Sequence, residues 1–379
     1  MREPDWDTAR SLLTDVAALP GETVPPALAD TRTLAGPIEA LTDLPATDTS
    51  AMDGWAVSGP GPWSVIGEVL AGATPMVTLQ PGQAVVIATG AAVPVGTSAV
   101  LRTEHGTVAA DTVDGPARSS DLRPRGEECR AGDMLAPAGT IVDPALIGLA
   151  CAAGIDELLV RRIPRVALLL FGDELVASGV AGPGRVRDSL GPQLPGWIRR
   201  LGAQVVSVAH AEDTLAAHVE AIRDAEADIV MTTGGTAAGP VDHLHAAVAE
   251  LGGQWVVDSV AVRPGHPMAA ARMSDRWLVA LPGNPQSAVV SLLTLGAPLI
   301  AALLGRWSPG LPTVTLGADA TAPAGEHRLL ACRLDAGTAS PVAHLGSAML
   351  RGLVAADGFA VLPPGGAATG TRVRWLALP

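Results

Sequence analysis

The chain has 379 residues, 48% of them hydrophobic, and a formal net charge of −13 at pH 7. This length allows about two to four domains with sizeable cores. The acidic balance and the lack of an arginine-rich stripe argue against a nucleic-acid surface. All 25 basic residues are arginine, a bias typical of a GC-rich genome.

The cysteines and the N-terminus indicate a compartment. Cys129, Cys151 and Cys332 are far apart and odd in number, so they form neither a disulfide framework nor a metal-ligand spacing. The first residues, Met1–Asp7, are polar and acidic and show no secretory signal. We therefore expect a protein of the reducing cytoplasm.

One uncharged stretch, residues 287–305, is long enough to cross a membrane. Gly296 and Pro298 interrupt it, and Asn284 and Pro285 precede it as the N-cap and first residue of a helix in a globular domain. We therefore expect this segment to lie buried beneath a sheet, with no membrane contact.

The first part of the chain predicts a helix and then small sheets. Residues 8–19 are amphipathic, with Ala9, Leu12, Leu13 and Val16 on one face. From about Thr23 to Ile163 short apolar runs are broken by Pro and Gly, which is typical of small antiparallel sheets joined by turns. The expected strands include residues 55–57, 63–66, 84–87 and 99–101, and a helix spans about 144–153.

From Arg165 the pattern alternates between strands and helices. Residues 166–171 form a continuous apolar run, as in a strand that a parallel sheet buries on both faces. This alternation predicts a doubly wound α/β domain. The elements expected next are helix 190–201, strand 205–208, helix 215–225, strand 228–232, helix 242–251, strands near 255–262, 267–271 and 277–281, and a long helix from Pro285.

After a linker at 306–312, brief strands separated by Gly and Pro predict a small C-terminal β-domain. The expected fold class is therefore multi-domain α/β plus β. We expect an N-terminal linking domain (residues 1–54 and 136–163), an inserted β-rich domain (55–135), a central doubly wound α/β domain (164–305) and the C-terminal β-domain (306–379).

Two glycine-rich loops follow buried strands of the expected α/β domain, at residues 234–242 and 281–287. Open α/β sheets bind ligands at the carboxyl ends of their strands. Glycine lets main-chain N–H groups approach an oxyanion closely, and so does a helix N-terminus such as the one expected at Pro285. The paired loops predict a site for a phosphate-bearing molecule.

Four further segments carry polar groups suited to such a site. Residues 48–56 place Asp53 in a tight turn, and residues 88–94 place the Thr89 hydroxyl beside a flexible backbone. Residues 126–128 form an acidic turn, and residues 172–175 put two acids directly after the first parallel strand. Each of these segments alone is a weak signal of function.

In order and spacing, these six segments resemble those of the molybdopterin molybdenumtransferase family, which includes the MoeA proteins and the gephyrin E domain. The resemblance extends from about Thr8 to Leu378. It implies that the α/β domain binds molybdopterin, and that the protein takes adenylylated molybdopterin and molybdate, inserts molybdenum into the dithiolene and releases AMP, with Mg²⁺ required. It also implies a homodimer in which the β-rich region of one subunit faces the α/β domain of its mate, with an adenylyltransferase as a possible partner.

Matching positions imply roles for individual residues. Catalytic roles fall to Asp53, Glu128, Glu174 and Asp242, with Asp242, Glu174 and Asp53 as Mg²⁺ ligands, because Mg²⁺ prefers carboxylate oxygens while bridging phosphates. Thr89 and Ser347 would donate hydrogen bonds to oxyanions. The expected substrate-binding residues are Thr89, Gly90, Asp188, Ser189, Gly234, Gly235, Gly239, Arg263, His266, Pro282, Gly283, Asn284 and Ser347.

Several of these residues also have a plain structural interpretation. Asp53 precedes a glycine in an ordinary turn pair, and Asp242 or Asn284 could simply cap a following helix. Glu174 could complement a helix dipole, and its neighbour Asp173 is expected to be structural. His243 and His245 are two residues apart, a poor spacing for a metal on one helix face.

The chain also departs from the family pattern. Glu128 stands where the family commonly has Asp, and Arg263 and His266 stand where it has Lys. Leu190 replaces an expected Asn, and Ala331 aligns with an expected basic residue.

Two other hypotheses therefore stay open: a catalytically weakened paralogue that binds molybdopterin or assembles partners, and an adenylyltransferase. The standalone adenylyltransferases lack the motif of residues 50–56 and the flanking β-domains, which argues against the latter.

Overall fold

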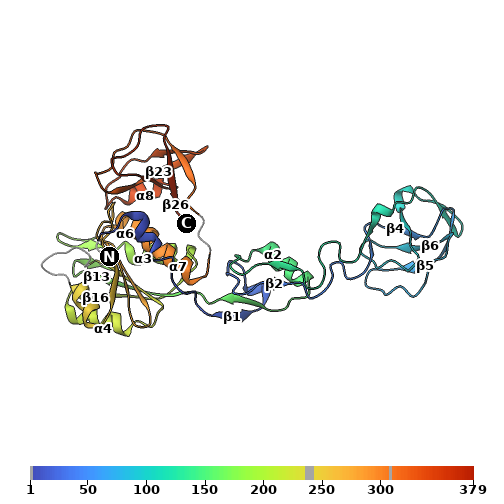
Figure 1. The fold of residues 1–379 in the computed structure, drawn as a ribbon, viewed down its shortest axis with the longest axis horizontal. Coiled ribbons are helices and arrows are strands. Elements are labelled where there is room, and N and C mark those ends of the chain that lie inside the picture. Colours follow the sequence, from blue (N-terminus) through green and yellow to red (C-terminus); the bar gives the residue numbers. More distant parts are fainter. Residues whose placement is uncertain (1–2, 235–242, 307–309) are drawn as a thin grey trace. The chain divides into compact units, whose positions relative to one another are not determined.

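The computed structural model describes residues 3–234, 243–306 and 310–379 (Figure 1). The predicted site residues Gly235, Gly239 and Asp242 lie outside these ranges. The chain divides into two compact units, which we call the α/β unit (Met1–Glu22, Thr31–Ala35 and Arg161–Pro379) and the β-rich unit (Thr23–Asp30 and Gly36–Val160). The finer division into four domains stays a prediction.

The α/β unit is built on a six-stranded sheet of order β16-β13-β17-β21-β20-β18. Its first four strands are parallel, as the sequence predicts, and β20 and β18 run antiparallel at one edge. The connection from β20 to β21, residues 273–276, is too short for a parallel crossover, so these strands form a hairpin. The strands are β13 (Arg165–Phe171), β16 (Gln204–Ala211), β17 (Ile229–Thr233), β18 (Gln254–Asp258), β20 (Ala269–Arg272) and β21 (Trp277–Leu281).

Helices cover both faces of this sheet, which confirms the doubly wound arrangement (Figure 1). Alternate residues of β13 face opposite cores: Leu168 and Leu170 pack with α3, α6 and α7, whereas Leu169 and Phe171 pack with α4 and α5. The helices are α3 (Leu190–Arg200), α4 (Leu215–Asp224), α5 (His243–Glu250), α6 (Pro285–Ser291) and α7 (Ala297–Leu303).

Helices α6 and α7 are one continuous helix, joined through a π-helical turn, η4 (Leu292–Gly296). By length and composition alone the segment Pro285–Leu303 could cross a membrane, but 83% of its apolar window is buried in the fold. This confirms the predicted burial. Helix α1 (Trp6–Ser11) packs against η4 through Trp6, whose Nε1 donates to Thr294 Oγ1 at 3.0 Å. It is shorter than the predicted 8–19, because i→i+3 bonds tighten the chain after Ser11.

The C-terminal part of the α/β unit is a second six-stranded sheet, of order β19-β23-β24-β22-β26-β25. An additional pairing of β23 with β25 closes five of its strands into a ring. Burial raises the pKa of the Cys332 thiol in this core to about 11, which suits an inert cysteine. The elements are β19 (Val262–Arg263), β22 (Thr313–Leu316), β23 (His327–Asp335), β24 (Thr338–Pro341), β25 (Gly358–Leu362), β26 (Arg372–Ala377) and α8 (Leu350–Ala355), with a short pair, β14 (Leu175–Val176) and β15 (Val186–Arg187), elsewhere in the unit.

The β-rich unit holds a six-stranded sheet of order β7-β4-β6-β5-β9-β8. The prediction of purely antiparallel sheets is wrong at one pair, since β5 and β6 run parallel. Their connection, residues 70–82, is long enough to carry the chain back before the second strand begins. The strands are β4 (Gly54–Val57), β5 (Trp63–Val69), β6 (Gln83–Ile87), β7 (Ala99–Arg102), β8 (Thr107–Ala109) and β9 (Thr112–Asp114).

Shorter elements accompany this sheet. The strands pair as β1 with β12, β2 with β11 and β3 with β10. Their bounds are β1 (Gly21–Val24), β2 (Ile38–Glu39), β3 (Thr49–Ser50), β10 (Leu122–Arg123), β11 (Met134–Ala136) and β12 (Leu158–Arg161), with helix α2 (Pro144–Ala152) and the 3₁₀ turns η1 (Pro26–Leu28), η2 (Thr103–His105) and η3 (Ser119–Asp121).

Candidate functional site

Three loops of the α/β unit meet at the carboxyl edge of its parallel strands, and Gly234 joins them. Its N–H donates to the carbonyl of Leu281 at 3.1 Å, and a Cβ added to it would lie 2.7 Å from the carbonyl oxygen of Phe171. A Cβ on Gly283 would lie 3.9 Å from the Gly234 Cα. Only glycine fits at position 234, since its φ is also +85°. The ends of β13, β17 and β21 therefore converge on bare backbone.

Glu174 lies at the same edge, directly after β13. Gly172 leaves room for its carboxylate, whose oxygens lie 2.8 and 2.9 Å from the position of a Cβ on that glycine. Glu174 is exposed, and among the described residues we find no donor bonded to its carboxylate. Asp173 instead accepts from the N–H of Asp213 at 3.3 Å, in keeping with its expected structural role. Of the two acids, Glu174 is the one whose carboxylate has no bonded donor among the described residues.

Asp188 is buried, and its carboxylate is fully occupied at the start of α3. One oxygen accepts from the N–H groups of Leu190 and Gly191 at 3.0 and 2.9 Å, and the other lies 3.1 Å from Nε2 of His210. Ser189 holds the N-cap position without a side-chain capping bond. This geometry favours helix capping over the predicted substrate binding by Asp188. Leu190, where an Asn was expected, belongs to the hydrophobic core.

The N-terminus of α6 already has an acceptor. The carbonyl oxygen of Ser347 accepts from the N–H groups of Gln286 and Ser287 at 3.0 and 3.3 Å. The expectation that this terminus holds phosphate oxygens therefore needs correction, because a phosphate would first have to displace that carbonyl. Asn284 stands at the N-cap without a side-chain capping bond; Pro282 is buried, whereas Gly283 and Asn284 are exposed. The contact places Ser347 beside Gln286 and Ser287 at the start of α6, and its predicted bond to an oxyanion stays a prediction.

Arg263 and His266 lie on a loop that packs against α6. A Cβ on Gly265 would come within 3.2 Å of Ser291 Oγ and 3.4 Å of the Ser287 carbonyl oxygen. Both side chains already have a carboxylate partner. Arg263 donates through Nε and Nη2 to Glu326 at 2.7 and 3.3 Å, which raises the pKa of Arg263, and His266 Nε2 lies 2.8 Å from Glu3 Oε1. The sequence analysis missed both partners.

In the β-rich unit, Asp53 and Thr89 form a pair. Asp53 Oδ1 accepts from the Thr89 N–H at 2.7 Å and from the Thr89 hydroxyl at 3.0 Å, and these bonds lower the pKa of the exposed carboxyl. In this structure the Thr89 hydroxyl donates to Asp53, and the predicted bond from Thr89 to an oxyanion stays a prediction. The neighbouring backbone needs glycine, because a Cβ on Gly54 would lie 2.0 Å from the Leu101 carbonyl oxygen and Gly90 has a φ of +79°.

Glu128 lies farther along the same unit. The segments around β3 and β10 run antiparallel, from Ser50 opposite Leu122 to Leu44 opposite Cys129. Glu128 donates its N–H to the Leu44 carbonyl at 2.9 Å, whereas Asp53 follows Ser50 at the other end. Glu128 is exposed, and the structure does not bring it to the Asp53–Thr89 pair.

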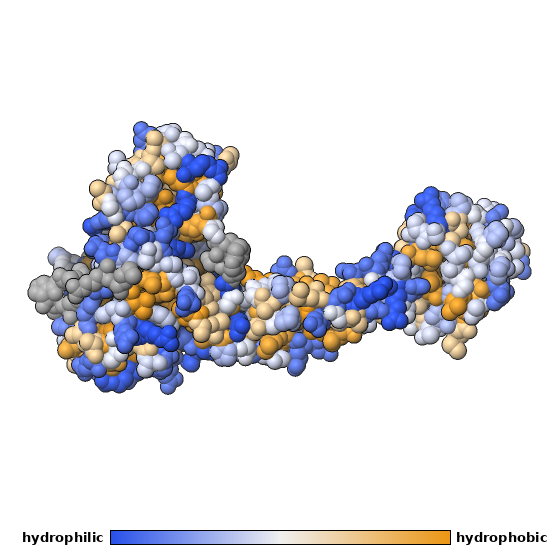
Figure 2. Space-filling model, in the orientation of Figure 1, coloured by the Kyte–Doolittle hydropathy of each residue, from blue (hydrophilic) through white to orange (hydrophobic). Residues whose placement is uncertain are grey.

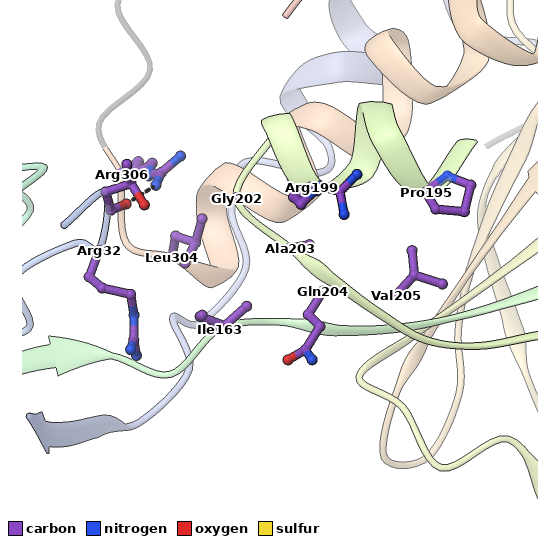
Figure 3. Close-up of a pocket in the computed structure, with 11 residues that line it drawn as sticks. Arg32, Ile163, Pro195, Arg199, Gly202, Ala203, Gln204, Val205, Leu304 and Arg306 are labelled. Carbon is purple, nitrogen blue, oxygen red and sulfur yellow. Dashed lines mark hydrogen bonds between the residues drawn. The ribbon is translucent and has the colours of Figure 1, made fainter. Parts of the chain in front are cut away.

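The cavity in Figure 3, of about 560 Å³, lies at the opposite edge of the sheet of the α/β unit, beside the first residues of β16. Its lining includes none of the predicted site residues that the structure describes. Arg306 donates there to Thr33 Oγ1 at 2.9 Å and to the carbonyls of Leu201 and Thr31 at 3.3 and 3.1 Å. Burial lowers the pKa of this guanidinium. The cavity is therefore separate from the candidate site, and its half-buried Arg306 already joins three segments.

Known proteins resemble the chain over almost its whole length. Residues 5–154 match the MoeA N-terminal region (domain I and II), 167–302 a probable molybdopterin binding domain, and 313–378 the MoeA C-terminal region (domain IV). A molybdopterin molybdenumtransferase 2 of Mycobacterium tuberculosis is 35% identical over 367 residues, covering 90% of each chain. A molybdopterin molybdenumtransferase of a Nostoc species is 34% identical over 305 residues, covering 74% of this chain and 70% of its own.

A solved structure agrees with this relationship. The molybdopterin biosynthesis MoeA protein of Pyrococcus horikoshii is 25% identical, with a TM-score of 0.85 that covers 100% of this chain and 99% of its own. Both the sequence and the three-part fold thus match the same group of proteins. The chain belongs to the molybdopterin molybdenumtransferase (MoeA) family.

Proposed function

We propose that this protein inserts molybdenum into adenylylated molybdopterin and releases AMP. Its family gives it a role in molybdenum cofactor biosynthesis as a transferase. The observation that carries the finer proposal is the convergence of residues 172–174, 234 and 282–284 at the carboxyl edge of the parallel strands. Bare glycine backbone beside an exposed carboxylate is the kind of surface that a pyrophosphate and a divalent cation can share.

Release of AMP breaks a phosphoanhydride bond, so the site must hold a pyrophosphate while charge develops on the leaving phosphate. Glu174 is exposed at the sheet edge, and the bonds from Thr89 lower the pKa of Asp53, so that this carboxylate stays ionised to lower pH than an ordinary aspartate. Each carboxylate belongs to a different unit of the chain. We propose that both act on the pyrophosphate neighbourhood, Glu174 beside the glycine loops and Asp53 as a group fixed in advance.

We also propose Mg²⁺ as the cofactor, as the resemblance implies. Among the described residues no group of three or more His, Cys, Asp or Glu side chains could hold a metal by itself. Mg²⁺ usually binds through one or two carboxylates together with substrate phosphates and water. Asp53 and Glu174 would supply those carboxylates, and the bound ion would neutralise charge on the pyrophosphate. Asp242, the third predicted ligand, lies outside the described residues.

A homodimer is supported by an apolar surface on the β-rich unit. Helix α2 carries no charged residue, and of its nine residues only Ala150 is fully buried. Leu28 and Leu41 are each 69% exposed, with Leu28 in η1, which contacts α2, and Leu41 bonded by its N–H to the Ala153 carbonyl. Figure 2 shows apolar surface around this helix. Such patches are typical of surfaces that another protein covers, here a second copy of the chain.

The dimer proposal predicts that Leu28→Glu together with Leu41→Glu yields monomers, because charge would be buried in the interface. Light scattering after size exclusion measures the mass, and Met76→Glu, at a residue 95% exposed on the same unit, is the control. An unchanged mass for the double variant would place the interface elsewhere.

We also propose a cytoplasmic location. We further propose an adenylyltransferase partner, since the substrate carries an adenylyl group that another reaction must attach.

The central test incubates the purified protein with adenylylated molybdopterin, molybdate and Mg²⁺. We expect release of AMP above a protein-free control, and loss of that release when Mg²⁺ is chelated. No AMP above background would refute the enzymatic proposal. Thermal stabilisation by adenylylated molybdopterin without AMP would instead favour a binding or assembly protein.

A further inference from the structure

The loop that carries Arg263 and His266, residues 262–267, is fixed from two sides by main-chain bonds. We call it the cation loop. On one side β19 pairs with β23, and His327 donates its N–H to the Ala261 carbonyl at 3.0 Å. On the other side, the Ala261 N–H donates to the Pro4 carbonyl at 3.0 Å, and the Glu3 N–H donates to the Asp258 carbonyl at 3.1 Å. The segments on both sides are therefore held in place beside the loop.

Each of these flanking segments brings a carboxylate to one cation of the loop. Glu326, immediately before β23, holds Arg263, and Glu3 holds His266. The residues that follow Glu3 also hold it in place, because Asp5 caps α1 and Trp6 is fully buried. Neither carboxylate thus depends on a flexible side chain alone to reach its partner.

The cation loop is part of the candidate site, because Gly265 packs against Ser287 and Ser291 of α6. Helix α6 begins where residues 282–284 end, at the edge formed with Gly234. A ligand anion that reaches this loop would meet two basic residues, Arg263 and His266, that each already have a carboxylate partner. This pairing bears on which anions the loop can bind.

We propose that Glu3 and Glu326 are specificity-determining residues that compete with the ligand for the cation loop. An anion can bind Nε and Nη2 of Arg263, or Nε2 of His266, only by displacing a carboxylate. A group with a single charge gains nothing in that exchange, whereas a polyanion such as pyrophosphate replaces one negative charge with several. The loop therefore selects for a pyrophosphate linkage. The inference rests on the proposed function, since it assigns the substrate pyrophosphate to this loop.

The expected effect is modest, because both pairs are partly exposed. The side chains of Arg263 and Glu3 are each 55% exposed, and exposed ion pairs are weak. Removing one competing carboxylate should therefore strengthen anion binding by about two- to fivefold.

The test measures the dissociation constants of inorganic pyrophosphate and orthophosphate by titration calorimetry at low salt. Glu3→Gln and Glu326→Gln should each bind pyrophosphate about two- to fivefold more tightly than the wild type. The dissociation constant of orthophosphate should fall by a larger factor than that of pyrophosphate. The ratio of the orthophosphate constant to the pyrophosphate constant should therefore be smaller than in the wild type. Glu220→Gln, which removes the same charge from the exposed side of α4, is the matched control and should have little effect.

Two double variants make the assignment specific. The gain from Glu3→Gln should vanish in a His266→Gln background, and the gain from Glu326→Gln should vanish in an Arg263→Gln background. The inference is overturned if pyrophosphate binding still tightens in the double variants. It is also overturned if Glu3→Gln and Glu326→Gln bind pyrophosphate no better than Glu220→Gln. Failure of every variant to bind pyrophosphate overturns it too, since release of the cations should create a measurable site. Circular dichroism melts verify folding.

Binding and turnover separate this inference from the proposed function. The pyrophosphate constants require no reaction, so the predicted pattern without AMP release would support the inference and refute the proposed function. If Glu3→Gln and Glu326→Gln release AMP but bind pyrophosphate no better than Glu220→Gln, the proposed function is supported and the inference is refuted.

Discussion

The two units present their carboxylates in different ways. In the β-rich unit, Asp53 is held by both the main chain and the hydroxyl of Thr89, so one oxygen is fixed and the charge is stabilised. In the α/β unit, Glu174 lies over Gly172 without a bonded donor among the described residues. The first group is organised before a ligand arrives, whereas the second can still adjust to it. We infer that Asp53 sets the geometry of the reaction and Glu174 adapts to the phosphates.

Substitution of Asp53 tests this division most strongly. Asp53→Asn keeps the shape and the hydrogen bonds from Thr89 but removes the charge, and we expect the rate of AMP release to fall by about 100-fold or more. Glu174→Gln, the matched change in the other unit, should reduce the rate less, because an adjustable group is easier to replace. Single-turnover measurements at saturating Mg²⁺ compare the two variants. A larger loss for Glu174→Gln would reverse the assignment of roles.

The backbone at the edge of the α/β unit should also be sensitive to substitution, with a smaller effect. Gly234→Ala places a Cβ 2.7 Å from the Phe171 carbonyl at a φ of +85°, so we expect a loss of about 1–3 kcal/mol in the free energy of unfolding. Gly252→Ala is the control, because its φ is +71° but a Cβ there meets no atom within 4 Å. Urea unfolding measures both variants. Equal losses would show that the crowding at Gly234 contributes nothing.

The sequence predicts much of the α/β unit because its signals are local. The continuous apolar run of β13 and the helices that follow were placed to within a few residues, since buried parallel strands and amphipathic helices have distinct periods. Asp188 shows where a local signal was overlooked. An acid two residues before an apolar helix start is a capping pattern, and the structure uses it so.

Other features could not be predicted, because they depend on contacts between distant segments. The pairs Glu3–His266 and Arg263–Glu326 join residues that only the folded chain brings together. The carbonyl of Ser347 reaches the start of α6 in the same way, through the fold of the C-terminal sheet. The parallel pairing of β5 and β6 likewise depends on the path of a long connection, which has no periodic signal.

The smallest effect concerns how Thr89 holds Asp53. Thr89→Val removes the hydroxyl bond and keeps the main-chain bond, so the pKa of Asp53 should rise part of the way toward its ordinary value. A carboxyl with a lowered pKa stays ionised to lower pH, and its contribution is lost as pH falls through that pKa. The acid limb of the pH–rate profile should therefore move to higher pH in Thr89→Val, with only a few-fold loss of rate at neutral pH. Thr89→Ser should restore the wild-type limb because it returns the hydroxyl. If the acid limb of Thr89→Val stays in place, Asp53 does not control it, and the prior organisation of Asp53 has no part in the reaction.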